Sequence, residues 1–279
     1  MTKLGAFLLG YGFFTGFCSL ALGTLSFLNV AWNTEEWVAP EPYRVLLVGV
    51  DEWPNSPPRA DSLHLVSLRF STRSIYILSI PRDSLVEIPG AGYDQINHAI
   101  GKGGIALLKT TVENLLAVPV EHYAIFRYSA FEKLVDGLGG LDIYVEKTMK
   151  CPNPGKKEET VLSRGNHNVK GEQILCYIRF RSEPLGDIAR VRRQQQVILR
   201  LSSKISQTSL PSLLKIYRGM EPFITSDLTM VDLVLLYNLF AGATLDAQNV
   251  FLLPGNFHPS GFWKPRIAEA RKLAQRIFD

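Results

Sequence analysis

Short apolar runs separated by turn residues recur along most of the chain, and their spacing predicts strands. Runs of four to eight residues rich in Val, Ile and Leu and bounded by Gly, Pro, Asn or Asp are typical of buried strands. Such runs predict strands over residues 44–50, 63–70, 74–80, 122–128, 141–146 and 250–253.

Between these runs, apolar residues recur at intervals of three and four, which predicts helices. Ile105, Leu108, Val112 and Leu115 share one helical face after two glycines, Gly103 and Gly104, and should pack on a sheet. Further helices are predicted over 131–138, 187–207, 212–217, 229–241 and 266–278. Alternating strands and helices favour an α/β domain.

The first apolar segment is different because residues 4–32 contain no charged side chain. About 20 apolar residues span a bilayer core of roughly 30 Å, so this segment predicts a transmembrane anchor. Lys3 precedes it and acidic residues follow, which places residues 1–3 in the cytoplasm and the remainder outside the cell membrane. We expect a linker over 33–42 and one extracytoplasmic domain over 43–279. A cleaved signal peptide is the alternative, although its apolar region is usually about 7 to 15 residues.

Composition narrows the class of ligand. The net charge of +4 is small and the basic residues do not form a tail, so the charge does not favour a nucleic-acid partner. The five histidines lack metal-ligand spacing, which argues against a zinc site. Cys151 and Cys176 pair in one interpretation, in an oxidising exterior, while in the other Cys176 is a buried thiol.

Acidic and arginine side chains stand where the first three predicted strands end or begin. Asp51 ends the first strand, Arg59 and Asp61 open the second, and Arg82 and Asp83 follow the third. Ligands of open α/β sheets bind at such rims, so we expect these side chains to lie close together.

A second group of polar side chains follows in the middle of the chain. Arg179 and Arg181 are two residues apart in a segment predicted to be extended, so their side chains project together. Arg190, Arg193 and Gln194 share a face of the helix predicted to start at 187. Arginine binds two phosphate oxygens at once, and paired acids hold a divalent cation. Both groups together predict a site for a pyrophosphate with its metal.

The same segments closely resemble the LytR-CpsA-Psr family of cell-wall glycopolymer ligases. One motif alone would be weak, whereas their order over residues 44–198 is specific. The motifs are Leu46-Leu47-Val48-Gly49-Val50-Asp51, Arg59-Ala60-Asp61-Ser62, Ser79-Ile80-Pro81-Arg82-Asp83-Ser84, Ile96-Asn97-His98-Ala99, Thr111-Val112-Glu113-Asn114-Leu115-Leu116, Leu134-Val135-Asp136-Gly137-Leu138-Gly139-Gly140-Leu141, Tyr177-Ile178-Arg179-Phe180-Arg181 and residues 186–195.

The resemblance implies a fold and an activity. Members have a three-layered α/β/α domain with a central mixed sheet, an amino-terminal membrane helix and an apolar tunnel for a polyprenyl chain. The implied reaction moves a phosphoglycan from a polyprenyl-pyrophosphate carrier to peptidoglycan, with Mg²⁺ as cofactor. The expected partners are therefore the lipid-linked glycan, the peptidoglycan acceptor and the membrane.

The resemblance also implies roles for individual residues. Asp51 and Asp61 match the acids that hold the magnesium ion. From the chemistry of the reaction, and not from the resemblance, we expect Asp61 or Asp51 to accept the proton of the acceptor hydroxyl, since arginine cannot act as a base. Gln194 matches a polar contact to the pyrophosphate, and Asp187 an acid that orients the arginines. The residues that match the phosphate-binding arginines are Arg59, Arg82, Arg179, Arg181 and Arg190.

Other interpretations stay open. Trp53, Gln95 and Lys102 depart from the residues that family members often carry, which leaves the acceptor side undefined. Asp83 and Arg193 fit a structural role as well as a site role, since isolated Arg–Asp pairs are commonly surface ion pairs. A pyrophosphate hydrolase and a non-catalytic polyanion-binding or regulatory module are the rival functions.

Overall fold

The computed structural model describes residues 41–51, 57–152, 159–180, 187–242 and 245–278. The predicted anchor over 4–32 and Arg181 lie outside these residues. Within the described ranges, no helix is both long and apolar enough to cross a membrane. From Pro42 onward the chain forms one compact unit.

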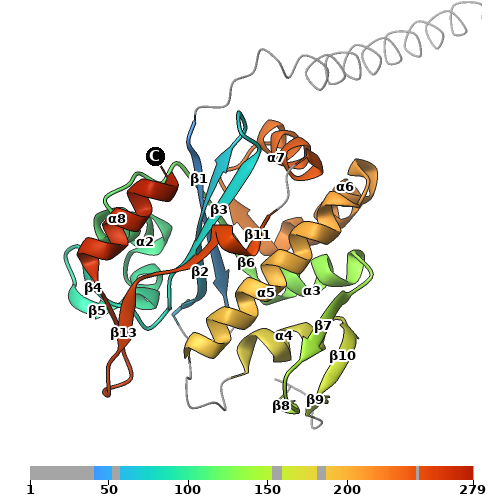
Figure 1. Cartoon of the computed structure of the whole chain (residues 1–279), viewed down its shortest axis with the longest axis horizontal. Coiled ribbons are helices and arrows are strands. Elements are labelled where there is room, and N and C mark those ends of the chain that lie inside the picture. Colours follow the sequence, from blue (N-terminus) through green and yellow to red (C-terminus); the bar gives the residue numbers. More distant parts are fainter. Residues whose placement is uncertain (1–40, 52–56, 153–158, 181–186, 243–244, 279) are drawn as a thin grey trace, which may run out of the picture. The chain divides into compact units, whose positions relative to one another are not determined.

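A six-stranded mixed sheet is the centre of this unit (Figure 1). Its two middle strands are antiparallel, and the neighbours on either side include both parallel and antiparallel pairs. The strand order is β11 (Ile224–Ser226), β6 (His122–Arg127), β1 (Tyr43–Val50), β2 (Ala60–Arg69), β3 (Ser74–Ser79) and β12 (Val250–Leu252). The mixed α/β fold predicted from the sequence is therefore confirmed.

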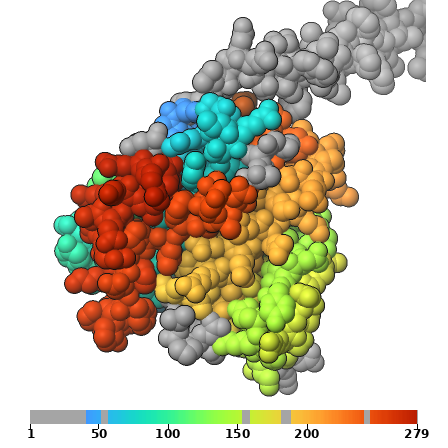
Figure 2. Space-filling model, viewed as in Figure 1, coloured from blue at the N-terminus to red at the C-terminus, as the bar shows by residue number. Residues whose placement is uncertain are grey.

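Helices cover both faces of the sheet. On one face, Leu63 and Leu65 of β2 share a core with Leu108 of α2 (Ala99–Leu116) and Phe278 of α8 (Ile267–Phe278). On the other face lies α5 (Asp187–Ser206), together with α3 (Tyr128–Gly137), α6 (Leu210–Met220) and α7 (Met230–Gly242) (Figure 1). In Figure 2 the red C-terminal segment that ends in α8 lies on the left of the visible face, and the gold residues of α5 lie to its right. The arrangement is three-layered.

A second apolar core lies away from the central sheet. Val135 of α3, Tyr177 of α4 (Glu172–Arg179) and Val197 of α5 belong to it. The strands β7 (Leu141–Val145) and β10 (Gly165–Val169) pair in a small sheet beside these helices. The remaining elements are β4 (Leu85–Ile88), β5 (Gly92–Gln95), β8 (Met149–Cys151), β9 (Thr160–Leu162), β13 (Gly255–Phe257), β14 (Trp263–Pro265), and the 3₁₀ helices η1 (Ile96–His98), η2 (Glu221–Phe223) and η3 (Ala247–Asn249).

Most predicted elements are present, and the differences have physical reasons. The helix predicted after Gly103 and Gly104 is confirmed as the part of α2 that runs to Leu116. The two glycines interrupt α2, and Gly104 has a φ of 66°, which a side chain would disfavour. The strand predicted over 141–146 exists as β7 but pairs with β10 outside the central sheet. The extended segment predicted around Arg179 is wrong: Arg179 is the last residue of helix α4.

Cys151 and Cys176 form a disulfide, which decides between the two interpretations of these cysteines. The bond joins β8 to α4 and closes a loop between residues 25 apart in sequence. A cross-link over a loop of this length contributes about 3 kcal/mol in the chain-entropy model. It ties down the helix that ends at Arg179.

Candidate functional site

The two acids predicted to hold a metal lie at the same edge of the central sheet. Asp51 directly follows β1, and Asp61 is the second residue of β2. Gly49 pairs with Ser62 and Val50 with Ala60, so Asp61 is the extra residue of a β-bulge. A bulge changes the direction of a side chain, which in a regular strand would be fixed by the alternation between the two faces of the sheet.

Each of these acids contacts an arginine from a distant part of the chain. Arg179 donates from Nη2 to Oδ2 of Asp51 at 2.9 Å, and Arg82 donates from Nη1 to Oδ1 of Asp61. Arg82 also lies 3.3 Å from Asp83, measured from Nε to Oδ1. We call Asp51, Asp61, Arg82 and Arg179 the charged cluster. Their side chains are 15–32% exposed, so they are open to a ligand.

Tyr128 joins the two halves of the charged cluster, and sequence reasoning missed it. Its hydroxyl donates to Oδ2 of Asp61 at 3.1 Å, and the guanidinium carbon of Arg179 lies 4.8 Å from the centre of its ring. Burial, with the nearby charge of Asp61, raises the pKa of Tyr128 well above its usual value. The phenol therefore stays protonated and acts as a hydrogen-bond donor.

Helix α5 brings further polar side chains to this edge. Arg190 is 3% exposed. Its positive charge lies near Tyr128 and opposes, to a small extent, the rise in the pKa of the phenol. Gln194, one turn further, lies 3.5 Å from the hydroxyl of Ser62, measured from Oε1 to Oγ. Ser62 is the neighbour of Asp61, so the helix and the charged cluster meet there.

Arg193 and Asp83 have structural partners. Arg193 donates from Nε to the carbonyl of Tyr177 at 3.0 Å and from Nη1 to Oε1 of Glu146 at 3.2 Å. It also donates to the carbonyl of Phe180, so it fastens α5 to the end of α4. Asp83 flanks Arg82.

The structure does not bring every predicted residue into contact. Arg59 is exposed, two residues before Asp61. Asp187 begins α5, but its side chain lies outside the described part of the structure. Arg181 lies outside the described residues altogether. The site described above thus consists of Asp51, Asp61, Arg82, Tyr128, Arg179, Arg190 and Gln194.

The acids of the charged cluster fit magnesium better than a metal that needs many protein ligands. Among the described residues, no group of three or more His, Cys, Asp or Glu side chains is placed to hold an ion. Mg²⁺ is usually bound through one or two carboxylates together with waters and substrate phosphates. Asp51 and Asp61, at one sheet edge beside arginines, match that pattern.

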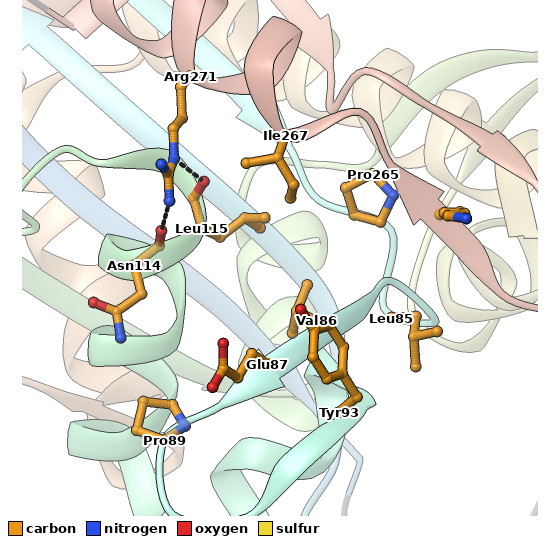
Figure 3. A pocket seen from close by; sticks show the side chains of 11 residues that line it. Leu85, Val86, Glu87, Pro89, Tyr93, Asn114, Leu115, Pro265, Ile267 and Arg271 are labelled. Carbon is orange, nitrogen blue, oxygen red and sulfur yellow. Dashed lines mark hydrogen bonds between the residues drawn. The ribbon is translucent and has the colours of Figure 1, made fainter.

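A cavity of about 640 Å³ lies on other elements, between the β4–β5 hairpin, α2 and α8. Its lining includes the rings of Tyr93 and Pro265 and the charged groups of Glu87 and Arg271 (Figure 3). Arg271 donates to the carbonyl of Asn114 at 2.9 Å. Leu85, at the start of β4, links the cavity to the segment that carries Arg82.

Two kinds of characterised protein resemble the chain. Regulatory protein MsrR of Staphylococcus aureus (strain COL) is 36% identical over 181 residues, which cover 63% of this chain and 54% of MsrR. The chain thus spans about half the length of that relative. The Bacillus cereus polyisoprenyl-teichoic acid–peptidoglycan teichoic acid transferase TagU is 32% identical over 237 residues, covering 83% of this chain and 76% of TagU.

Solved structures have the same fold. Bacillus subtilis TagV superposes with a TM-score of 0.74 at 25% identity, covering 87% of this chain and 99% of TagV. TagT bound to LIIa-WTA superposes with a TM-score of 0.69 at 27% identity, covering 86% and 91%. The family model of the LytR_cpsA_psr family matches residues 29–263, and the chain therefore belongs to that family.

Proposed function

We propose that this protein is a membrane-anchored phosphotransferase that moves a phosphoglycan from a polyprenyl-pyrophosphate carrier to peptidoglycan. The observation that carries the proposal is the charged cluster, in which arginines from two distant segments meet paired acids at one sheet edge. The name of the relative TagU, a polyisoprenyl-teichoic acid–peptidoglycan teichoic acid transferase, supports the proposal. The anchor is the segment 4–32, with the domain outside the cell membrane.

In the proposed reaction, a hydroxyl oxygen of peptidoglycan attacks the phosphorus next to the glycan. A new P–O bond forms, and the bond to the polyprenyl phosphate breaks with its electron pair. Asp61 or Asp51 accepts the proton of the attacking hydroxyl, since arginine cannot act as a base. Negative charge develops on the phosphate oxygens, and positioned cations such as Arg82, Arg179 and Arg190 stabilise it.

Asp51 and Asp61 would hold the magnesium ion beside the pyrophosphate. The ion would neutralise negative charge on the phosphate oxygens. Tyr128, kept protonated, donates to Asp61 and fixes the direction of that carboxylate. Arg190 and Gln194 approach from α5, and Arg59 and Arg181, with Asp187 orienting the arginines, complete the proposed pyrophosphate site.

One assay separates this function from its rivals. The purified full-length chain is incubated in detergent with a lipid-linked phosphoglycan, Mg²⁺ and peptidoglycan, and the products are separated by size. We expect a covalent conjugate of glycan and peptidoglycan. Free phosphoglycan would instead indicate a hydrolase. Unchanged donor that nevertheless binds the protein would favour the regulatory module, a class suggested by the name of MsrR.

The cavity shown in Figure 3 is the proposed position of the peptidoglycan acceptor. Peptidoglycan combines sugar rings with peptide carboxylates, and the lining offers matching groups. Tyr93 is 74% exposed and can stack on a sugar, while Lys264 and Arg271 attract carboxylates. Leu85, which lines the cavity, follows Arg82 of the charged cluster by three residues in the sequence.

Replacing Tyr93 by alanine therefore weakens use of the acceptor. We expect the peptidoglycan concentration at half-maximal rate to rise about threefold or more, as loss of one aromatic stacking contact predicts. Hydrolysis or binding of the lipid-linked donor should not change. Tyr144→Ala, at another exposed tyrosine outside the cavity, is the matched control. An unchanged acceptor requirement in the Tyr93 variant removes the acceptor from this cavity.

A further inference from the structure

A row of polar side chains lies buried between the central sheet and α5, next to the charged cluster. Ser62 and His64 occupy alternate positions of β2, so they face the same side, and Ser79 of β3 lies beside them. His64 is 5% exposed and Ser79 is fully buried. Burying a polar group costs free energy unless the group is hydrogen-bonded, so we followed the hydrogen bonds that these side chains form.

The direction of the hydrogen bonds is set at the end away from the site. Gln195 donates from Nε2 to the backbone carbonyl of Phe251 at 3.0 Å, an interaction that requires the amide nitrogen rather than the oxygen. The same nitrogen lies 2.9 Å from Oγ of Ser79 and donates to it. The single hydrogen of the Ser79 hydroxyl is therefore available for the next group.

That next group is His64. Its Nδ1 lies 3.0 Å from Oγ of Ser79 and accepts the serine hydrogen. The ring proton must then be on Nε2, which lies 2.8 Å from Oγ of Ser62 and donates to it. The hydroxyl of Ser62 in turn donates to Oε1 of Gln194 at 3.5 Å, the longest contact of the series.

This series ends at the side chain predicted to contact the pyrophosphate. Because the oxygen of the Gln194 amide accepts from Ser62, the NH₂ group of the same amide is directed elsewhere. We propose that His64 is a positioning residue: it holds Gln194, through Ser62, with the amide NH₂ presented as a donor to the phosphate oxygens of the substrate. This inference rests on the proposed function and names a further residue of the same site.

The chemistry of His64 suits this role better than that of a core side chain. Burial lowers the pKa of His64 to about 4, so the imidazole is neutral near pH 7 and has one donor and one acceptor. A protonated ring would present two donors and would have nothing to offer the hydrogen of Ser79. A leucine would fill the volume but break the series at its centre.

The first test is independent of catalysis. Nitrogen NMR of the ¹⁵N-histidine-labelled full-length chain distinguishes the two neutral tautomers of an imidazole, and loss of one signal in a His64→Gln variant assigns it. We expect the tautomer with the proton on Nε2. A proton on Nδ1 alone would reverse the direction of the series, and a ring protonated on both nitrogens at pH 7 would leave the hydrogen of Ser79 without its acceptor. Either result would overturn the proposal.

The second test measures binding of inorganic pyrophosphate with Mg²⁺ by calorimetry. A hydrogen bond to a charged group is worth about 1.5–3 kcal/mol, so loss of the Gln194 donor predicts roughly 10- to 100-fold weaker binding in Gln194→Ala. His64→Leu should weaken binding in the same range, and adding it to Gln194→Ala should change little further. His64→Gln supplies one acceptor and one donor and should bind within about threefold of the natural protein.

Ser67→Ala is the matched control, because Ser67 is a buried serine of the same strand whose hydroxyl has no hydrogen-bond partner in the described part of the chain. Thermal unfolding of each variant identifies loss of structure. Natural binding by a folded His64→Leu variant would overturn the role of His64, and so would natural binding by Gln194→Ala. Failure of the unaltered protein to bind pyrophosphate would instead refute the proposed function itself.

Discussion

Replacing Arg82 or Arg179 by alanine is expected to slow transfer of the phosphoglycan about 100-fold or more, the usual cost of removing one positioned donor from a developing negative charge. Both side chains lie in the charged cluster and come from different segments: Arg82 from the turn that follows β3, and Arg179 from the end of α4. The initial rate of conjugate formation measures the effect. Arg179→Lys should recover only part of the rate, since lysine keeps the charge but loses the forked geometry.

The control for this prediction is Arg192→Ala. Arg192 is an exposed arginine of α5, close in sequence to Arg190 but on the solvent side of the helix. The Arg192 variant should transfer at the natural rate. Near-normal transfer by purified Arg82→Ala or Arg179→Ala would exclude that arginine from the reaction.

Removing magnesium is expected to reduce the rate of transfer at least as much as these arginine substitutions do. Chelation with EDTA should stop transfer, and added Mg²⁺ should restore it. Replacing Asp51 or Asp61 by asparagine should raise the Mg²⁺ concentration at half-maximal rate by ~10-fold or more. Losing a residue that only hydrogen-bonds to a metal ligand already weakens metal binding by about that factor. A titration of the initial rate against Mg²⁺ concentration measures this shift.

Asp246→Asn is the control for the metal, because Asp246 is an exposed acid outside the site. It should leave the magnesium requirement unchanged. Transfer that continues at full rate in EDTA, or an Asp61→Asn variant with a natural magnesium requirement, would contradict the metal site. Loss of rate at every Mg²⁺ concentration would assign Asp61 to proton transfer alone.

Much of the fold follows from local sequence because its central strands are nearly continuous apolar runs. The segments that form β1 and β3 are rich in Val, Ile and Leu, and their ends place Asp51 and Arg82 at one edge. In contrast, β10 has the sequence Gly-Asn-His-Asn-Val, which resembles a loop and becomes a strand only because it pairs with β7. Tertiary pairing of that kind leaves no periodic signal.

The site was only partly predictable for the same reason. Arg179 follows Ile174, Cys176, Tyr177 and Ile178, residue types common in strands, yet the segment is a helix whose buried face packs on α5. Tyr128 belongs to none of the motifs. It is the first residue of α3, directly after β6, and this position brings its hydroxyl to Asp61. The alternation of Ser62 and His64 is visible in the sequence, but their partners, Gln194 of α5 and Ser79 of β3, are not.

The bond between Cys151 and Cys176 has a practical consequence for biochemical work. The helix it restrains carries Arg179, which reaches Asp51 from 128 positions away in the sequence. Dithiothreitol or a similar thiol in the purification buffer would reduce the disulfide and release that helix from β8. Low activity of such a preparation would then be an effect of the reductant and not a property of the native protein. Samples should be prepared without such additives, and the absence of unmodified thiol at these two positions verified by alkylation and mass spectrometry.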